Sequence, residues 1–226
     1  MNIGVLGTGI VGRAIAGRCA ELGHDVMIGT RDPQATLSRT EPDRYGGPPF
    51  SEFHGQRPEI ALGTFAEAAA HGELVVNAAE GAASVQALTA AGAENLDGKV
   101  LLDVSNPLDA TAGMPPPLFV SNTDSLAEQI QRAFSGARVV KSLNTVNASV
   151  MVNPEQLAGG DHTVFVSGDD AVAKAAVSEL LRSFGWRDIV DLGDLSTARG
   201  AEMYVTLWVR LWGVVQDPIF NVKVVR

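Results

Sequence analysis

Residues 2–12 read Asn-Ile-Gly-Val-Leu-Gly-Thr-Gly-Ile-Val-Gly, a short apolar run that leads directly into three closely spaced glycines. The apolar residues that follow recur at three-to-four-residue spacing: Val11, Ile15, Cys19 and Leu22. This order predicts a strand, a glycine turn and then a helix. A second β-type run over 25–28 closes a strand-helix-strand unit, which is the building block of a parallel sheet.

Further short apolar runs alternate with Ala-rich or helix-periodic segments along the rest of the chain. These runs are 60–62, 74–76, 100–102, 139–140, 163–166 and 189–192. Such alternation is typical of an α/β, Rossmann-type fold with a doubly wound, mainly parallel sheet. We expect residues 1–194 to form one domain of this type. Residues 195–226 should form a C-terminal helical segment that packs on the sheet or on a dimer partner.

Two segments depart from a regular alternation of strands and helices. Residues 38–58 are polar and rich in Gly and Pro, which predicts a long loop. The helix predicted over 195–213 carries only a narrow polar stripe, formed by Glu202, Thr206 and Arg210, and is otherwise apolar. A helix this apolar is expected to be buried, either in its own chain or against a second subunit. We therefore predict a homodimer that uses this helix.

The composition narrows the class of protein and of partner. The chain has 226 residues, of which 46% are hydrophobic, and 17 Lys+Arg against 26 Asp+Glu give a net charge of −9. This charge disfavours binding to nucleic acid or anionic lipid. The most apolar later stretch, 204–215, is too short for a membrane span. A single cysteine and four scattered histidines offer no zinc-type spacing, so we expect a cytoplasmic, metal-free protein.

The three glycines have separate roles if the turn binds a dinucleotide. Gly7 allows the tight turn, Gly9 lets the backbone approach a pyrophosphate, and Gly12 permits close packing of the helix. The pyrophosphate would lie at the helix N-terminus, held by backbone N–H groups that include those of Ile10 and Val11. A turn can require glycine for its shape alone, but the strand-turn-helix context favours dinucleotide binding.

The end of the second predicted strand bears on which dinucleotide binds. An NAD site usually places an acidic residue there to accept from the ribose hydroxyl, whereas this chain offers Thr30 and Arg31. A hydroxyl followed by a guanidinium suits a 2′-phosphate, so we predict that residues 1–194 form an NADP-binding domain. In the competing interpretation, the Asp32 carboxylate binds the ribose hydroxyls. That residue precedes Pro33, however, and an Asp-Pro pair is also a common helix start.

Polar residues follow three of the later predicted strands. They occupy 77–80, 105–107 and 144–147. Because ligands of doubly wound sheets bind at the carboxyl ends of the strands, these residues would surround the nicotinamide. Turn chemistry alone would also explain each of them.

Six motifs together resemble the NADP oxidoreductase, coenzyme F420-dependent family. They are Gly-Thr-Gly-Ile-Val-Gly at 7–12, Leu-Gly-His at 22–24, Gly-Thr-Arg at 29–31, Asp-Val-Ser-Asn-Pro at 103–107, Val-Lys-Ser-Leu-Asn-Thr at 140–145 and Gly-Asp-Asp at 168–170. Similar motifs occur in the reductase domain of the STEAP metalloreductases. The resemblance implies hydride exchange between NADP(H) and the deazaflavin F420, with their rings held face to face.

The resemblance also implies which residues contact the two small molecules. Those implied for the NADP(H) cofactor are Gly7, Thr8, Gly9, Ile10, Val11, Gly12, Thr30, Arg31, Ala79, Val85, Asn106 and Ser149. Those implied for the second substrate are Asn144, Thr145 and Asn147. No side chain is assigned a catalytic role, because the cofactors carry the chemistry and the protein positions them.

Two alternative functions remain open from the sequence. One is an NADPH-dependent reductase of a small ketone or imine, although the related dehydrogenases place a catalytic Lys or Asp on a large helical C-terminal domain. Here only about 30 residues follow Asp194, and the predicted helix 195–213 has no Lys. The other is a non-catalytic NADP(H) redox sensor, which would keep the phosphate-binding residues without a second pocket.

Overall fold

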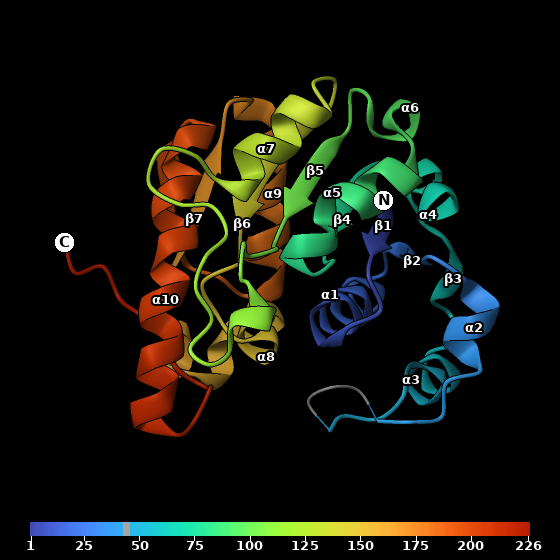
Figure 1. Cartoon of the computed structure of the whole chain (residues 1–226), viewed down its shortest axis with the longest axis horizontal. Coiled ribbons are helices and arrows are strands. Elements are labelled where there is room, and N and C mark those ends of the chain that lie inside the picture. The colour runs from blue at the N-terminus through green and yellow to red at the C-terminus, as the bar shows by residue number, and fades with distance from the viewer. Residues whose placement is uncertain (43–45) are drawn as a thin grey trace.

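The computed structural model describes residues 1–42 and 46–226. Within these ranges, eight strands form one sheet in the order β3-β2-β1-β4-β5-β6-β7-β8 (Figure 1). The strands are β1 Asn2–Leu6, β2 Asp25–Thr30, β3 Ala61–Thr64, β4 Leu74–Asn77, β5 Val100–Asp103, β6 Arg138–Ser142, β7 Thr163–Gly168 and β8 Asp188–Gly193. All neighbours pair in parallel except β6 and β7, which are antiparallel. The predicted α/β Rossmann-type fold is confirmed.

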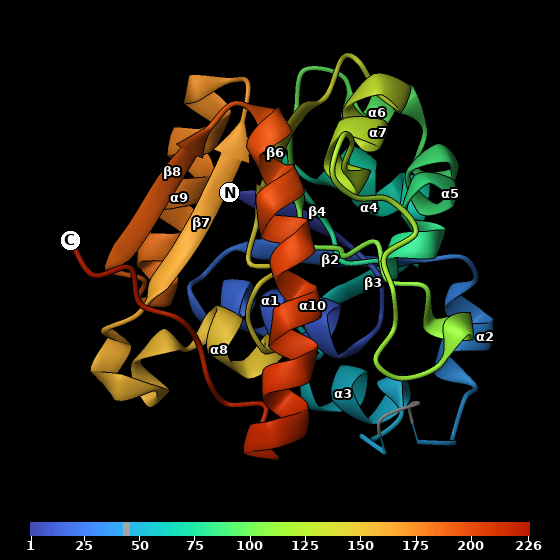
Figure 2. The same ribbon diagram turned by 60° about the vertical axis from the view of Figure 1, so that its left-hand side comes forward.

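Helices cover both faces of this sheet. They are α1 Ile10–Glu21, α2 Pro33–Leu37, α3 Phe50–Gln56, α4 Phe65–His71, α5 Gly81–Ala91, α6 Ala93–Leu96, α7 Leu126–Ala133, α8 Ala148–Val152, α9 Ala171–Phe184 and α10 Ala198–Val215. One hydrophobic cluster packs α1, α3, α8 and α9 against the sheet, and a second cluster packs α4, α5, α6, α7 and the start of α10. Figure 2 shows α9 and α10 on opposite sides of β7.

The prediction of an unbroken loop over 38–58 is wrong in its second half. Residues 50–56 form α3, which begins directly after the extended Pro49. Phe50 is buried in the core cluster and Phe53 packs against it. Two aromatic residues three positions apart give this short helix an apolar face, which the Gly and Pro content of the surrounding segment conceals. Residues 43–45, which belong to the same prediction, lie outside the described residues.

The C-terminal helix is only partly buried within the chain. A 3₁₀ turn over Leu195–Thr197 precedes α10, which ends two residues beyond the predicted Gly213. Val205 and Val209 are buried, but Leu207 is 52% exposed and Val214 is 82% exposed. One of the two predicted arrangements was burial of the whole helix within its own chain. The structure does not have this arrangement. The division of the chain at 194/195 stays a prediction.

Candidate functional site

The turn between β1 and α1 requires glycine at two positions for steric reasons. Gly7 has a φ of +127°, and a Cβ there would lie 2.6 Å from the carbonyl oxygen of Ala78. A Cβ on Gly12 would lie 2.1 Å from the carbonyl oxygen of Gly7. Both distances are far below van der Waals contact, so the turn and the start of the helix pack too closely for any side chain.

Gly9 has a different environment, because it faces open space. It is the exposed N-cap of α1, and a Cβ built on it would meet no atom of the described residues within 4 Å. The helical bond from Arg13 N–H reaches its carbonyl oxygen over 3.0 Å. The preceding N–H groups, those of Ile10 and Val11, bond to nothing in the described ranges, and the first turn holds no acidic residue. This arrangement suits an anionic group that lies against the backbone.

Three consecutive residues at the end of β2 and directly after it have different environments. Thr30 is buried, and its hydroxyl lies 2.9 Å from that of Thr36. Arg31 is exposed and, within 1–42 and 46–226, has no ion pair or side-chain hydrogen bond. The Asp32 carboxylate accepts from Ala35 N–H over 2.9 Å and caps α2. The interpretation of Asp32 as a helix cap is confirmed, and Arg31 is available to an anion.

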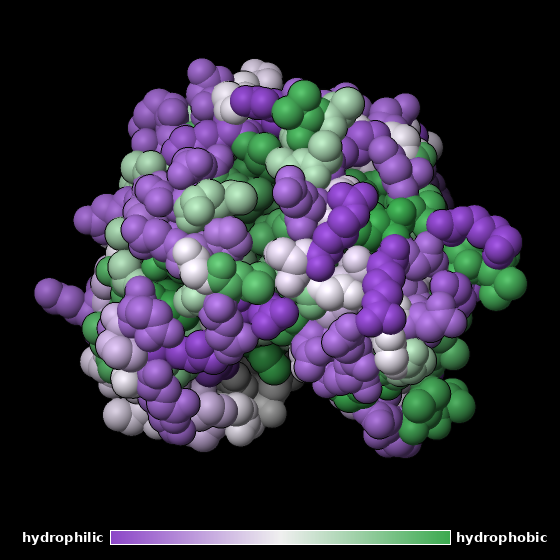
Figure 3. All heavy atoms as spheres, turned by 180° about the vertical axis from the view of Figure 1, so that it is seen from behind, coloured by the Kyte–Doolittle hydropathy of each residue, from purple (hydrophilic) through white to green (hydrophobic). Residues whose placement is uncertain are grey.

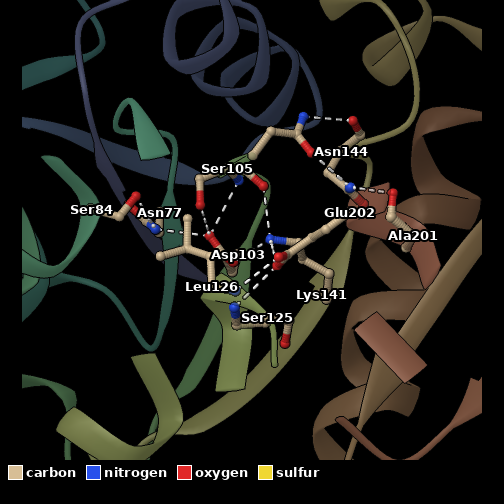
Figure 4. Close-up of polar contacts among 12 residues, drawn as sticks. Asn77, Ser84, Asp103, Ser105, Ser125, Leu126, Lys141, Asn144, Ala201 and Glu202 are labelled. Atoms are coloured by element: carbon tan, nitrogen blue, oxygen red, sulfur yellow. Dashed lines mark hydrogen bonds and ion pairs between the residues drawn. The ribbon is translucent and has the colours of Figure 1, made fainter. Parts of the chain in front are cut away.

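A buried ion-pair cluster lies beneath the loops at the carboxyl ends of β5 and β6 (Figure 4). Lys141 Nζ lies 2.6 Å from Asp103 Oδ2, 2.7 Å from Glu202 Oε1 and 2.7 Å from the carbonyl oxygen of Ser105. All three charged side chains are withdrawn from solvent. Burial alone lowers the pKa of Lys141, but the two carboxylates outweigh that effect and hold the pKa above its ordinary value.

The two carboxylates of this cluster have further donors, so its excess negative charge is compensated. Asp103 accepts from Asn77 Nδ2 over 2.8 Å and from the Ser105 hydroxyl over 2.7 Å. Glu202 accepts from the N–H groups of Leu126 and Ala127, over 2.8 and 3.1 Å, at the start of α7. The cluster thereby joins β4, β5 and β6 to α7 and α10.

Above the cluster, two asparagines hold the loops after β5 and β6 together. Asn106 Nδ2 donates to the carbonyl oxygen of Asn144 over 2.8 Å, and Asn144 Nδ2 donates to Asn106 Oδ1 over 2.9 Å. Asn144 Nδ2 also donates to the carbonyl oxygen of Ala201 on α10 over 3.0 Å. The Asn144 amide is thus engaged within the chain, and the loop positions are fixed with respect to α10.

The other residues implied for substrate and nicotinamide lie in the loop after β6, in the loop between β4 and α5, where Ala79 is found, or on helices α5 and α8. Thr145 is 2% exposed, and its hydroxyl finds no hydrogen-bond partner among the described residues. Asn147 caps α8 by accepting from the Ser149 N–H and hydroxyl, over 2.9 and 3.0 Å. Val85 lies partly exposed on α5. Their roles in binding stay predictions.

Reasoning from the sequence did not anticipate the ion-pair cluster. Asp103 and Lys141 occur in quoted motifs, and Glu202 occurs in the polar stripe of the last helix, but no pairing among them was expected. The available signal was a lysine that directly follows Val139 and Val140 in a run predicted to be a buried strand. A lysine at such a position needs a carboxylate partner.

Comparison with known proteins shows to which family the chain belongs. Residues 2–107 match the family model described as NADP oxidoreductase, coenzyme F420-dependent. A crystal structure of a protein from Arthrobacter sp. FB24, described provisionally as an F420-dependent NADP reductase, is 60% identical in sequence to this chain. The two structures superpose with a TM-score of 0.96, and the match covers 100% of each chain. The chain belongs to the F420-dependent NADP oxidoreductase family. The resemblance stated from the motifs is therefore confirmed.

This member of the F420-dependent family also has more distant relatives. The chain spans nearly all of one of them and only part of another. The F420-dependent NADP reductase of Methanothermobacter marburgensis is 29% identical over 218 residues, which are 93% of this chain and 92% of the relative. Rat metalloreductase STEAP3 is 30% identical over 202 residues, which are 89% of this chain and 36% of STEAP3. The chain thus spans about a third of STEAP3. The predicted class of NADP-dependent oxidoreductase is confirmed at the level of the family.

One finding concerns membranes. In the part of the chain that the structure describes, no helix combines the length and the apolar character that crossing a bilayer requires.

Proposed function

We propose that this protein transfers a hydride between NADP(H) and a deazaflavin or flavin-like acceptor, with coenzyme F420 as the preferred one. The observation that carries this proposal is the open N-terminus of α1 at Gly9, combined with the guanidinium of Arg31 after β2, which pairs with no described residue. When bound, the nicotinamide and the deazaflavin supply the hydride donor and acceptor. The protein supplies position and exclusion of water.

The dinucleotide has two phosphate groups to be bound, the pyrophosphate and the 2′-phosphate. Each would have its own site at the carboxyl ends of β1 and β2. The N–H groups of Ile10 and Val11, with Thr8 and Gly9 beside them, would hold the pyrophosphate. Arg31 would pair with the 2′-phosphate, and this role is supported by its exposed position and by the absence of an acidic partner for it among residues 1–42 and 46–226. Thr30 would support that contact indirectly. The bond between its hydroxyl and that of Thr36 holds the backbone that carries Arg31 in place. A carboxylate in this place would repel the phosphate.

The nicotinamide and the acceptor would meet where the loops after β4, β5 and β6 converge. We assign Ala79, Val85, Asn106 and Ser149 to the nicotinamide half and Asn144, Thr145 and Asn147 to the acceptor. The Thr145 hydroxyl, which has no hydrogen-bond partner among the described residues, supports this assignment. A buried hydroxyl without a partner costs free energy that a ligand can recover. Bonds between Asn106 and Asn144 keep these loops in place before binding.

Oxidation of NADPH, followed by absorbance, tests this proposal directly. The purified protein is mixed with NADPH and, in separate runs, with oxidised F420, free flavin or a ferric chelate, and NADH serves as the control donor. We expect rapid turnover with F420 and NADPH, and slow turnover with NADH. Binding of NADPH without turnover on any acceptor would refute the proposal and favour the redox-sensor interpretation.

We also propose that the protein is a homodimer in the cytoplasm. The last turns of α10 expose Trp212, Val214 and Val215, which form an apolar end that a second copy would cover. Sedimentation at micromolar concentration should give twice the chain mass of 23.7 kDa. A species of 23.7 kDa alone would refute the dimer.

A further inference from the structure

The segment that follows β5 forms one wall of a groove against α10. The segment leaves the site at Pro107 and returns beside it, because Phe119 N–H donates to the Pro107 carbonyl oxygen over 2.9 Å and Leu108 bridges to Leu118. Figures 1 and 2 both show it running alongside α10. The groove has a volume of about 580 Å³, within the usual range for small-molecule sites.

The residues that line the groove are close along the chain to residues that hold the site together. Its walls include Pro115, Pro117, Leu118, Met203, Leu207 and Arg210. Met203 follows Ala201 by two residues on α10, and the Ala201 carbonyl oxygen accepts from Asn144. On the opposite wall, Leu118 is next to Phe119, which is bonded to the residue after Asn106. Each wall is therefore connected, within a few residues of the chain, to a residue that is hydrogen-bonded to the Asn106–Asn144 pair or adjacent to it.

The groove combines an apolar lining with a single charge. Among the described residues that line it, only Arg210 is charged. Arg210 is exposed, its Nη1 donates to the Thr206 carbonyl oxygen of its own helix over 3.2 Å, and no carboxylate in the described ranges pairs with it. In a chain with a net charge of −9, a cation without an acidic partner is a local site for an anion.

We infer that this groove binds the acceptor, with the flat ring against its apolar walls and an anionic group of the acceptor on Arg210. This inference rests on the proposed function. It assigns Arg210 as a residue that selects among deazaflavins by charge. F420 carries a phosphate and carboxylates on its side chain, whereas its riboflavin-like deazaflavin fragment carries neither. Arg210 should therefore favour F420 over the uncharged fragment, although both present the same ring.

Steady-state kinetics with NADPH and these two deazaflavins test the role of Arg210. For the wild type we expect a lower KM for F420 than for the fragment, with similar kcat. Arg210→Gln should raise the KM for F420 about tenfold and leave that for the fragment unchanged. The matched control is Arg182→Gln, which removes one exposed charge from α9 on the other side of the sheet and should alter neither KM.

A second variant tests the groove independently of the charge. Leu207→Trp adds bulk to an exposed wall residue, so it should raise the KM for both deazaflavins and leave the KM for NADPH unchanged. An unchanged ratio of the two KM values in Arg210→Gln, or unchanged KM values in Leu207→Trp, would overturn the inference while the proposed function stands. Absence of turnover by the wild type with either deazaflavin would instead overturn the proposed function, and this inference with it.

Discussion

Lys141 Nζ on β6 lies 2.7 Å from Glu202 Oε1 on α10, and both side chains are withdrawn from solvent. The pair connects a central strand to the last helix, and Asp103 completes the cluster from β5. Because the loops after β5 and β6 carry Asn106 and Asn144, the buried charges lie directly beneath the proposed site. Fixing these strand ends fixes the surface on which the two rings would meet.

Removal of the lysine should be costly, because it leaves two buried carboxylates without their common cation. Lys141→Met should lower the free energy of unfolding by about 3–5 kcal/mol, measured by chemical denaturation. Lys174→Met is the control. That lysine pairs with the largely exposed Asp191 over 2.9 Å, and its loss should cost about 1 kcal/mol or less. Equal losses in the two variants would contradict the importance given to the buried cluster.

The same cluster predicts how stability depends on pH. The folded pKa of Lys141 lies above its unfolded value of about 10.4, so its contribution is fully present below that pH and is lost as pH rises through the folded pKa. The difference in unfolding free energy between wild type and Lys141→Met should therefore stay constant from about pH 7 to 10 and narrow above that range. A difference that narrows already at neutral pH would contradict the raised pKa.

Two glycines of the β1–α1 turn should separate nucleotide binding from stability. Gly9→Ala places a Cβ in open space, so stability should change by less than about 0.5 kcal/mol, while NADPH affinity should fall about tenfold because the backbone no longer approaches the pyrophosphate. Gly12→Ala drives a Cβ against the Gly7 carbonyl oxygen and should cost roughly 1–3 kcal/mol of stability. Thermal melts and fluorescence titration measure both effects. Unaltered NADPH binding by Gly9→Ala would count against the site.

Arg31 should determine the preference for NADPH over NADH. Arg31→Ala should weaken NADPH binding by about 1–3 kcal/mol, the scale of a hydrogen bond to a charged group, and leave NADH binding nearly unchanged. Titration calorimetry with the two nucleotides measures the difference. Equal losses for both would remove Arg31 from the 2′-phosphate site.

Cys19 should be inert in the folded protein. Its side chain is fully buried on α1, and burial raises the pKa of the thiol to about 12, against a smaller opposing effect of Arg18. A disulfide reagent at pH 8 should therefore label the native protein at least about 100-fold more slowly than the unfolded chain, because the thiolate is the reactive form. Comparable rates in both states would show that α1 opens readily.

The order of elements and the glycine turn could be predicted because their signals are local. Short apolar runs, helix periodicity and the positions of Gly7 and Gly12 follow from the backbone conformation of each segment. Helix α3 was missed because the buried Phe50 and the partly buried Phe53 lie within a segment whose Gly and Pro content indicates a loop. The link between Lys141 and Glu202 was missed because it depends on how the chain brings β6 and α10 together, which no local pattern encodes.

The space-filling view from behind shows the surface hollowed at its lower edge, between the side that carries α2 and α3 and the side that carries α8 and α10 (Figure 3). On the second of these sides, the position of α10 follows from the direction of β7 and β8. Because these two strands run against β6, the chain emerges from β8 at the edge away from the glycine turn. A helix of 18 residues, about 27 Å long, then runs back past the opposite edge. Had the last two strands kept the common direction, α10 would start at the edge that holds the glycine turn and lead away from it, and the groove proposed for the acceptor would lose the wall that α10 provides.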